Sequence, residues 1–103
     1  MTPRRGEIWW ADSLDKRRPV LVITRSAAVP VLDVITIVPV TRTVRGIPTE
    51  LRLGPVEGLR RECVAAFDAI QPIRRSFLTE RVGALALDRL DEVCFALEQL
   101  ADC

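Results

Sequence analysis

The sequence of 103 residues contains no histidine and no tyrosine. These absences remove the commonest general acid–base side chain and the phenolic alternative, and they exclude Ser-His-Asp and Cys-His catalytic sites within one chain. A zinc site would lack imidazole ligands, and the three cysteines form no CxxC pair. No glycine-rich phosphate loop or Walker pattern is present, which argues against nucleotide hydrolysis. We therefore expect neither a metal nor a cofactor.

Membrane and secretion signals are also missing. No apolar run approaches the ~18 residues of a membrane span, and residues 1–7 lack the apolar segment of a signal peptide. The odd number of cysteines gives no disulfide framework, which fits a reducing cytoplasm. No linker, repeat or low-complexity tract divides the chain, so we expect one domain over residues 1–103. Its core would be modest, and dimerisation would compensate for that.

Lysine is nearly absent, because 14 of the 15 basic residues are arginine and only Lys16 is lysine. The net charge is +1, but the charge is unevenly distributed. Residues 1–81 hold 14 basic and 9 acidic residues, whereas residues 82–103 hold one basic residue, Arg89, and five acidic ones. The planar guanidinium suits phosphate and carboxylate groups, although an arginine excess also follows from a GC-rich genome. The body of the chain is thus basic and its tail acidic.

Short runs rich in apolar and β-branched residues, bounded by turn residues, predict a mostly β fold. Adjacent Trp9 and Trp10 would point to opposite faces of a strand, so at most one of them is expected in the core. Pro39 must lie at a bulge or at a position whose N–H is not needed. The expected strands are 7–12, 18–24, 33–41, 47–53, one or two strands within 62–73 that bend at Asp68, and 81–85.

The acidic tail predicts a C-terminal helix. Asp88 and Asp91, three residues apart, resemble a capping box and would favour the positive end of the helix dipole. The predicted fold class is therefore mostly β (α+β), a small antiparallel β-barrel closed by a C-terminal α-helix. An apolar stripe at helical spacing is expected at Leu87, Leu90, Cys94, Leu97 and Ala101, widened by Val93 and Leu100.

The residue types that remain for chemistry are arginine, hydroxyl and carboxylate side chains. This set can cleave RNA, because the substrate supplies its own nucleophile in the 2′-OH and the protein has to orient the phosphate and stabilise its charge. Arg18 precedes the apolar run Pro19–Thr24, which places a bidentate cation at the mouth of a buried strand. We take Arg18 as the centre of a candidate phosphate-handling site.

Several motifs, in the same order along the chain, resemble the MazF/PemK toxin family. The resemblance covers essentially the whole chain, and it implies an SH3-like barrel with a C-terminal helix. It also implies a homodimeric, ribosome-independent endoribonuclease that is the toxin of a type II toxin–antitoxin pair and leaves 2′,3′-cyclic phosphate and 5′-hydroxyl ends. The motifs are residues 5–9 (RGEIW), 18–24 (RPVLVIT), 38–41 (VPVT), 46–50 (GIPTE), 63–71 (CVAAFDAIQ) and 81–83 (RVG).

The resemblance implies catalytic roles for Arg18 and Thr41. Arg18 would clamp the phosphate and stabilise the transition state, and a role as proton donor is the weaker assignment because a guanidinium has a pKa above ~12. Thr41 would hydrogen-bond a phosphate oxygen or the attacking hydroxyl. The alternatives are a surface Arg18 paired with Asp15 or Glu7, and a Thr41 that is an ordinary strand residue.

Asp68 matches the acidic residue that PemK-type members use as a base. In those relatives an arginine lies two residues earlier, where this chain has Ala66, so Asp68 alternatively shapes a turn. The segment 13–17 is shorter than in many members and lacks their glycine-rich sequence. The resemblance places this segment over the RNA groove and against the antitoxin, so the cleavage sequence does not carry over from the family.

The remaining cations and tryptophans are candidates for binding single-stranded RNA. A phosphate-tracking rim would make binding strongly salt-dependent, while scattered solvated arginines are the alternative. Trp9 or Trp10 would stack on a base or, alternatively, pack in the core or at a dimer contact. The RNA-binding candidates are Lys16, Arg17, Arg25, Arg42 and Arg45, with Arg52, Arg60 and Arg61 as further rim residues.

Two other functions remain open for such a barrel. A CcdB-like toxin would use the surface of its C-terminal helix to grip a protein such as DNA gyrase, and would lack the pairing of Arg18 with Thr41. A catalytically inactive barrel would act as a binding module. For the nuclease, a cognate antitoxin with an acidic, partly disordered segment is the expected protein partner.

Overall fold

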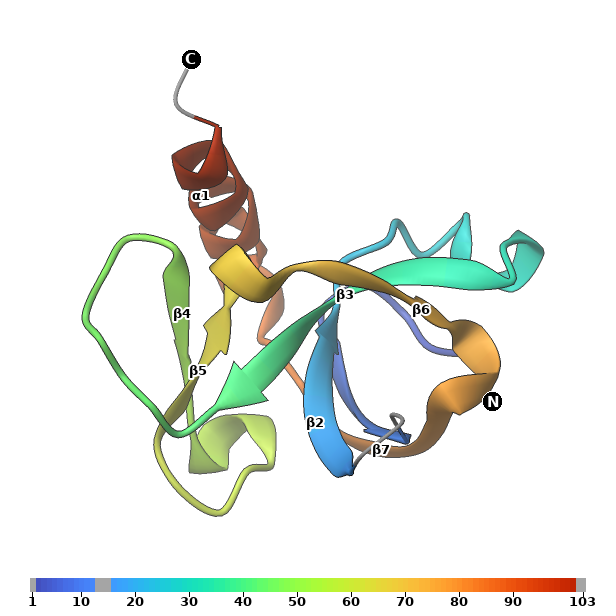
Figure 1. The fold of residues 1–103 in the computed structure, drawn as a ribbon, viewed down its shortest axis with the longest axis horizontal. Helices are drawn as coiled ribbons and strands as arrows, with labels where there is room; N and C mark the ends of the chain where they lie inside the picture. The colour runs from blue at the N-terminus through green and yellow to red at the C-terminus, as the bar shows by residue number, and fades with distance from the viewer. Residues whose placement is uncertain (1, 13–15, 102–103) are drawn as a thin grey trace.

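The computed structural model describes residues 2–12 and 16–101. Its described part consists of β-strands, short 3-10 turns and a C-terminal α-helix, which confirms the predicted mostly β fold with a terminal helix (Figure 1). The strands are β1 (Glu7–Asp12), β2 (Arg17–Val22), β3 (Val34–Thr41), β4 (Glu50–Leu53), β5 (Cys63–Ala66), β6 (Gln71–Arg74) and β7 (Leu78–Ala84), and the helix is α1 (Leu90–Leu100). The 3-10 turns are η1 (Val29–Val31), η2 (Pro55–Glu57), η3 (Phe67–Ala69), η4 (Arg75–Phe77) and η5 (Leu87–Arg89).

Strand β3 is the strand that the two halves of the sheet share. The sheet order is β4-β5-β3-β2-β1-β7, all pairs being antiparallel, and β6 pairs with the first half of β3. On one side β3 pairs with β2, and on the other side its partner changes from β6 to β5. Figure 1 shows β3 running from the half that holds β2, β6 and β7 to the half that holds β4, β5 and α1.

Pro39 lies where the partner of β3 changes. The Ile23 N–H donates to the Thr36 carbonyl at 3.2 Å, so the backbone N–H and C=O of Thr36 face β2. Because these groups alternate along a strand, the backbone N–H and C=O positions of residues 37 and 39 face the neighbour on the other side of β3. On that side the β6 ladder ends at Ile37 and the β5 ladder begins at Val40. Pro39 therefore occupies a position whose N–H is not needed, as the sequence analysis requires.

Residues that alternate along the central strands pack into two separate hydrophobic cores. One face of β1, β2 and β3 carries Ile8, Leu21 and Val38, which pack with β4, β5 and α1 in one cluster of buried residues. The other face carries Trp9, with only 4% of its surface exposed, and its neighbours inside the second cluster. Trp10 is half-buried, so only one of the two tryptophans lies in the core, as predicted.

The start of the helix differs from the prediction. Residues 87–89 form the 3-10 turn η5, and α1 begins at Leu90 with Arg89 as its N-cap and no side-chain cap, so the predicted capping box at Asp88 is wrong. Leu87 is 86% exposed and Cys94 is exposed, so the predicted stripe is also shifted. Arg89 explains this start, because its guanidinium is held by the barrel and fixes where the helix can begin. The helix residues buried or packed against the core are Leu90, Val93, Ala96, Leu97 and Leu100.

Two strand boundaries were also wrong. The predicted strand 47–53 is ordered as β4 only from Glu50, because residues 47–49 turn, with the Glu50 N–H donating to the Ile47 carbonyl at 3.0 Å. The predicted strand 81–85 begins earlier, at Leu78, where β7 pairs with β1. Among the helices of the described residues, none has the length and apolar character needed to cross a membrane.

Candidate active site

Arg18 and Thr41 lie at the ends of neighbouring strands. The ladder between β2 and β3 ends at the pair Val20–Pro39, and the same register continued by two residues puts Arg18 level with Thr41. Residues at even spacing share a face of a strand, so both side chains belong to the face of Val20. Figure 1 shows that β2 and β3 diverge toward these two ends. The structure thus brings the two predicted catalytic residues to one open end of the sheet.

Pro19 weakens the pairing of the two strands at this point. The backbone N–H of Ile23 faces β3, and backbone groups face the same neighbour at every second residue, so the backbone of residues 21 and 19 also faces β3. The next hydrogen-bonded pair after Leu21–Val38 would be Pro19 with Val40, and proline has no N–H to donate. On the opposite edge of β3, pairing with β5 begins beyond Pro39, through the pairs Val40–Ala65 and Thr41–Val64.

None of the described residues neutralises the Arg18 guanidinium. Within residues 2–12 and 16–101, no hydrogen bond or ion pair engages this half-buried side chain. Glu7, one alternative partner, instead accepts from Arg81 Nε at 2.9 Å. Burial alone would raise the pKa of Glu7, but hydrogen bonds from the Trp9 side chain, the Arg4 N–H and Arg81 hold this pKa below its usual value. The other alternative partner, Asp15, and the loop Ser13–Asp15 lie outside the described residues.

The Thr41 hydroxyl is oriented by the loop that follows it. The Thr43 N–H donates to Thr41 Oγ1 at 3.2 Å, so the oxygen serves as acceptor on that side and the hydroxyl proton is available to a further acceptor. Thr41 is half-buried, whereas every residue from 42 to 48 is exposed. Arg42 and Arg45, two of the predicted RNA-binding residues, lie in this loop.

The other RNA-binding candidates are distributed over both ends of β2. Lys16 and Arg17 are exposed and directly precede Arg18. Arg17 is engaged, because its Nη2 lies 2.9 Å from Glu80 Oε2 and its guanidinium carbon lies 4.8 Å from the centroid of the Trp10 ring. Arg25 follows the opposite end of β2, so the structure does not bring it together with Arg18.

Asp68 is not next to Thr41. Val64 pairs with Thr41, and from there β5 runs along β3 away from the open end, so that Asp68 lies four residues further on, in η3. At ~3.3 Å per extended residue, the three residues from Val64 to Phe67 span roughly 10 Å along the strand direction. The exposed Asp68 accepts a hydrogen bond from Thr49, with 2.6 Å between Thr49 Oγ1 and Asp68 Oδ2.

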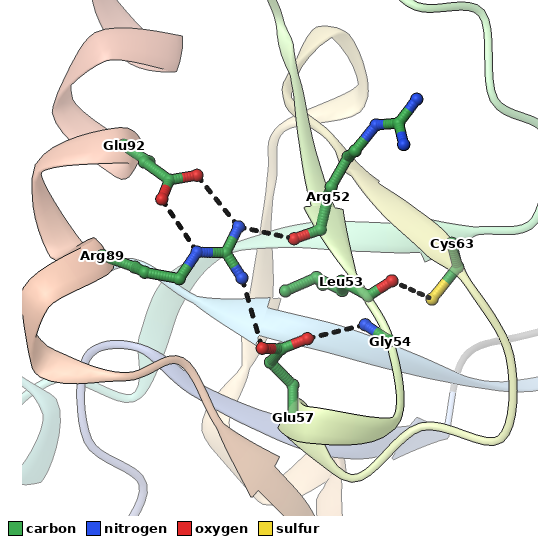
Figure 2. A network of polar contacts seen from close by, with 7 residues as sticks. All are labelled: Arg52, Leu53, Gly54, Glu57, Cys63, Arg89 and Glu92. Carbon is green, nitrogen blue, oxygen red and sulfur yellow. Dashed lines mark hydrogen bonds and ion pairs between the residues drawn. The ribbon is translucent and has the colours of Figure 1, made fainter.

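A polar network between the helix and the barrel was missed by the sequence analysis (Figure 2). The buried Glu57 carboxylate accepts from the Gly54 N–H at 2.6 Å and from Arg89 Nη1 at 3.2 Å. Arg89 also binds both oxygens of Glu92, at 2.8 and 2.9 Å, and donates to the Arg52 carbonyl at 2.7 Å. Hydrogen bonding and the charge of Arg89 lower the pKa of Glu92. The sequence held one signal for this network, because Arg89 is the one basic residue of the acidic tail, residues 82–103.

Cys63 borders this network and has no features of a nucleophile. Burial raises the pKa of its thiol, and the negative charge of Glu57 raises it further, so the neutral form is favoured. Its Sγ lies 3.8 Å from the Leu53 carbonyl oxygen, to which it can donate. No cluster of three or more potential metal-ligating side chains occurs among the described residues.

A surface hollow lies away from Arg18 and Thr41. One of its lining arginines, Arg75, is engaged through Nη1 with the Val29 carbonyl at 2.7 Å. The hollow is lined by Thr2, Pro3, Pro30, Asp33, Arg74, Arg75, Ser76 and Leu78. It contains neither Arg18 nor Thr41, so we place the candidate site at the open end of β2 and β3, where these two residues lie.

Comparisons with known proteins agree with this fold. Residues 4–101 match the family described as the PemK-like, MazF-like toxin of type II toxin–antitoxin systems, and the chain belongs to this family. It is 37% identical over 103 residues, covering 98% of this chain and 94% of the relative, to the probable endoribonuclease MazF5 of Mycobacterium tuberculosis H37Rv.

Solved structures show the same fold. The Mycobacterium tuberculosis toxin MazF-mt6 superimposes with a TM-score of 0.85 at 35% identity, over 90% of this chain and 93% of that one. An endoribonuclease in complex with its cognate antitoxin, from a mycobacterial species, gives a TM-score of 0.83 at 26% identity, over 94% and 92% of the two chains. The resemblance identified from the sequence motifs is therefore confirmed.

Proposed function

We propose that this chain is the toxin of a type II toxin–antitoxin system and acts as a metal-independent endoribonuclease on single-stranded RNA. The carrying observation is that Arg18 and Thr41 lie at the open end of β2 and β3 and that no described residue neutralises the Arg18 guanidinium. The proposal is supported by relatives that are named probable endoribonucleases and whose similarity covers almost the whole chain. We take residues 1–103 as one toxin domain that works as a homodimer in the cytoplasm.

In the proposed reaction the 2′-hydroxyl oxygen of a ribose attacks the adjacent phosphorus. The bond from phosphorus to the 5′ oxygen breaks, which leaves a 2′,3′-cyclic phosphate and a 5′-hydroxyl. The 2′-hydroxyl loses a proton and the departing 5′ oxygen gains one. Arg18 clamps the non-bridging oxygens through its planar fork and stabilises their developing charge. The Thr41 hydroxyl donates a hydrogen bond to a phosphate oxygen, and the Thr43 N–H sets its orientation.

We assign RNA binding first to the basic residues nearest the open end of β2 and β3. Arg42 and Arg45 in the exposed loop after Thr41, with Lys16 and Arg17 before Arg18, would follow the phosphates of the strand. Arg25 would contact RNA only beyond the opposite end of β2. Asp68, the base suggested by the resemblance, is left out of the chemical step because its carboxylate engages Thr49 rather than facing Thr41.

The proposed protein partner is a cognate antitoxin. A relative of the same fold has been solved in complex with its own antitoxin, which supports the assignment. An acidic, partly disordered antitoxin segment would compete with RNA for the cations around Arg18 and would fold on binding. The CcdB-like alternative is disfavoured, because the similar proteins are named endoribonucleases.

The test is incubation of the purified protein with a mixed RNA pool in EDTA, followed by mapping of the ends. We expect discrete cuts with 5′-hydroxyl ends. They should disappear in Arg18→Ala and with a 2′-deoxy substitution at the cut site, while Arg74→Ala, on the surface hollow, should cut normally. Absence of cleavage by the wild type, together with inhibition of DNA gyrase, would overturn the proposal in favour of the CcdB-like function.

A further inference from the structure

The loop between β3 and β4 carries two of the proposed RNA-binding arginines but has no packing of its own. All residues from 42 to 48 are exposed, and Val44 and Ile47 are 46% and 39% exposed. A loop without buried side chains is held only by its polar contacts. Arg42 and Arg45 can present their charges at a fixed place near Thr41 only if such contacts restrain the backbone between the two strands.

Glu50, the first residue of β4, holds the middle of this loop. Its Oε1 accepts from the Arg45 N–H at 2.9 Å and from the Gly46 N–H at 2.8 Å, and its Oε2 lies 3.2 Å from the Arg45 nitrogen. Gly46 has a φ of +72°, so the carboxylate caps two successive N–H groups of a tight turn. The Glu50 charge is therefore used on the loop backbone, and the arginine side chain stays available.

Asp68 holds the end of the same loop. Thr49 is buried, with 8% of its surface exposed, and its hydroxyl donates to Asp68 Oδ2 at 2.6 Å. The Phe67 N–H donates to the Thr49 carbonyl at 3.0 Å, and Phe67 itself is fully buried in the core. The carboxylate of Asp68 thus sits on a turn anchored by Phe67, and it fixes the residue at which the loop enters β4.

We infer that Glu50 and Asp68 are positioning residues that hold the loop 42–48 so that Arg42 and Arg45 face the RNA beside Thr41. This inference rests on the proposed ribonuclease function and assigns to Asp68 a role other than general base. A base would need an ionised Asp68 carboxylate, whereas a loop anchor needs only an oxygen that accepts the Thr49 proton. The two roles therefore predict different results for Asp68→Asn and for Thr49→Val.

The kinetic test compares variants on both sides of the Thr49–Asp68 hydrogen bond. Asp68→Asn keeps an acceptor oxygen, and Thr49→Ser keeps the hydroxyl, so both should retain the wild-type turnover, KM and pH profile within about twofold. Asp68→Ala and Thr49→Val should each raise KM about tenfold with little change in kcat, and their double variant should be no worse than either. Asp91→Ala, an exposed carboxylate on α1, is the matched control.

For Glu50, the readout is amide hydrogen exchange as well as KM. Glu50→Ala should speed exchange at the Arg45 and Gly46 amides and raise KM, and Glu50→Gln should restore both because it keeps an acceptor oxygen. Unchanged exchange in Glu50→Ala would overturn the role of Glu50. If Asp68→Asn slows turnover by about two orders of magnitude while Thr49→Val has no effect, Asp68 is the base and its role as an anchor is overturned.

The proposed function and this inference fail separately. If the wild-type protein cleaves no RNA, the ribonuclease proposal fails, and the exchange of the loop amides in Thr49→Val and Glu50→Ala still decides whether the carboxylates anchor the loop. If the wild type cleaves RNA and neither the KM nor the exchange responds to these substitutions, the inference alone is overturned.

Discussion

Arg18 and Arg89 are both half-buried arginines, and the protein uses them in opposite ways. Arg89 is surrounded by acceptors, because Glu57, Glu92 and the Arg52 carbonyl all bind its guanidinium. Arg18 has none of these contacts among the described residues. A guanidinium whose hydrogen bonds are satisfied internally stabilises the fold, and one that is left without an anion can bind an anion from outside. The comparison separates a structural cation from the proposed functional one.

The largest effect, on RNA cleavage, is expected when the planar guanidinium of Arg18 is replaced by a group that keeps only its charge. Arg18→Lys should slow the turnover of RNA cleavage by about 100-fold, because a lysine cannot make the bidentate contact to the phosphate oxygens. The thermal midpoint should stay unchanged, since no described residue depends on Arg18. Cleavage assays and thermal unfolding on the same samples check this. Full activity in the lysine variant would show that charge alone suffices.

The reverse pattern is expected for Arg89. Arg89→Met should lower the free energy of unfolding by about 2–4 kcal/mol, because it leaves the carboxylate of Glu57 buried without a cation. Cleavage per folded molecule should not change. Chemical denaturation gives the measurement, and Arg52→Met is the control, because only the backbone carbonyl of Arg52 takes part in the network. Equal stability of the two variants would contradict the role assigned to Arg89.

Acid should weaken the network of Arg89 and also the contacts of Glu7. Hydrogen bonds to Arg89 lower the pKa of Glu92. Burial raises the pKa of Glu7, but hydrogen bonds from Trp9, Arg4 and Arg81 lower it by more. A lowered carboxyl pKa contributes stability that is present above the unfolded-state value and lost as the pH falls through the folded-state value. The unfolding free energy should therefore decline below about pH 4.5, the ordinary value for glutamate. In Arg89→Met the decline should be shallower, and an identical slope would contradict this assignment.

The smallest effect is expected at the exposed pair of Arg17 and Glu80. Both side chains are about half exposed or more, at 48% and 67%, so the pair is weak in water. Glu80→Gln should change the unfolding free energy by less than about 1 kcal/mol. It should also release Arg17 toward RNA and lower KM slightly at low salt. A large loss of stability would place Arg17 with Arg89 as a structural cation.

The architecture and the family could be predicted from short-range patterns in the sequence, and the same patterns gave the candidate site. Apolar runs and their turn residues gave β1 at its observed bounds and β3 within one residue, and the motifs around Arg18 and Thr41 gave the family. These signals work because strand alternation and turn chemistry are local. The relation of Arg18 to Thr41 needed the register of two strands, which a single sequence does not encode locally.

Most of the misses depend on contacts between distant segments. Arg89 reaches Glu57, which is 32 residues away, and this contact moves the start of α1 from the expected cap at Asp88. Residues 47–49 turn, with the Glu50 N–H donating to the Ile47 carbonyl, and this turn shortens the predicted strand 47–53. The partner of Asp68 is a buried threonine 19 residues earlier in the chain, which no local pattern indicates. Hydrogen bonds and ion pairs whose partners no local pattern indicates are the common cause.

Pro19 has a consequence for the energetics of substrate entry. Since its nitrogen carries no hydrogen, the chain forgoes a backbone hydrogen bond to Val40 both with and without substrate. RNA bound at this end of the strands would meet one ladder hydrogen bond fewer, so less of its binding free energy would be spent on separating β2 from β3. The covalent structure of one residue thus weakens the pairing of the two strands directly beside Arg18, the proposed phosphate-binding residue.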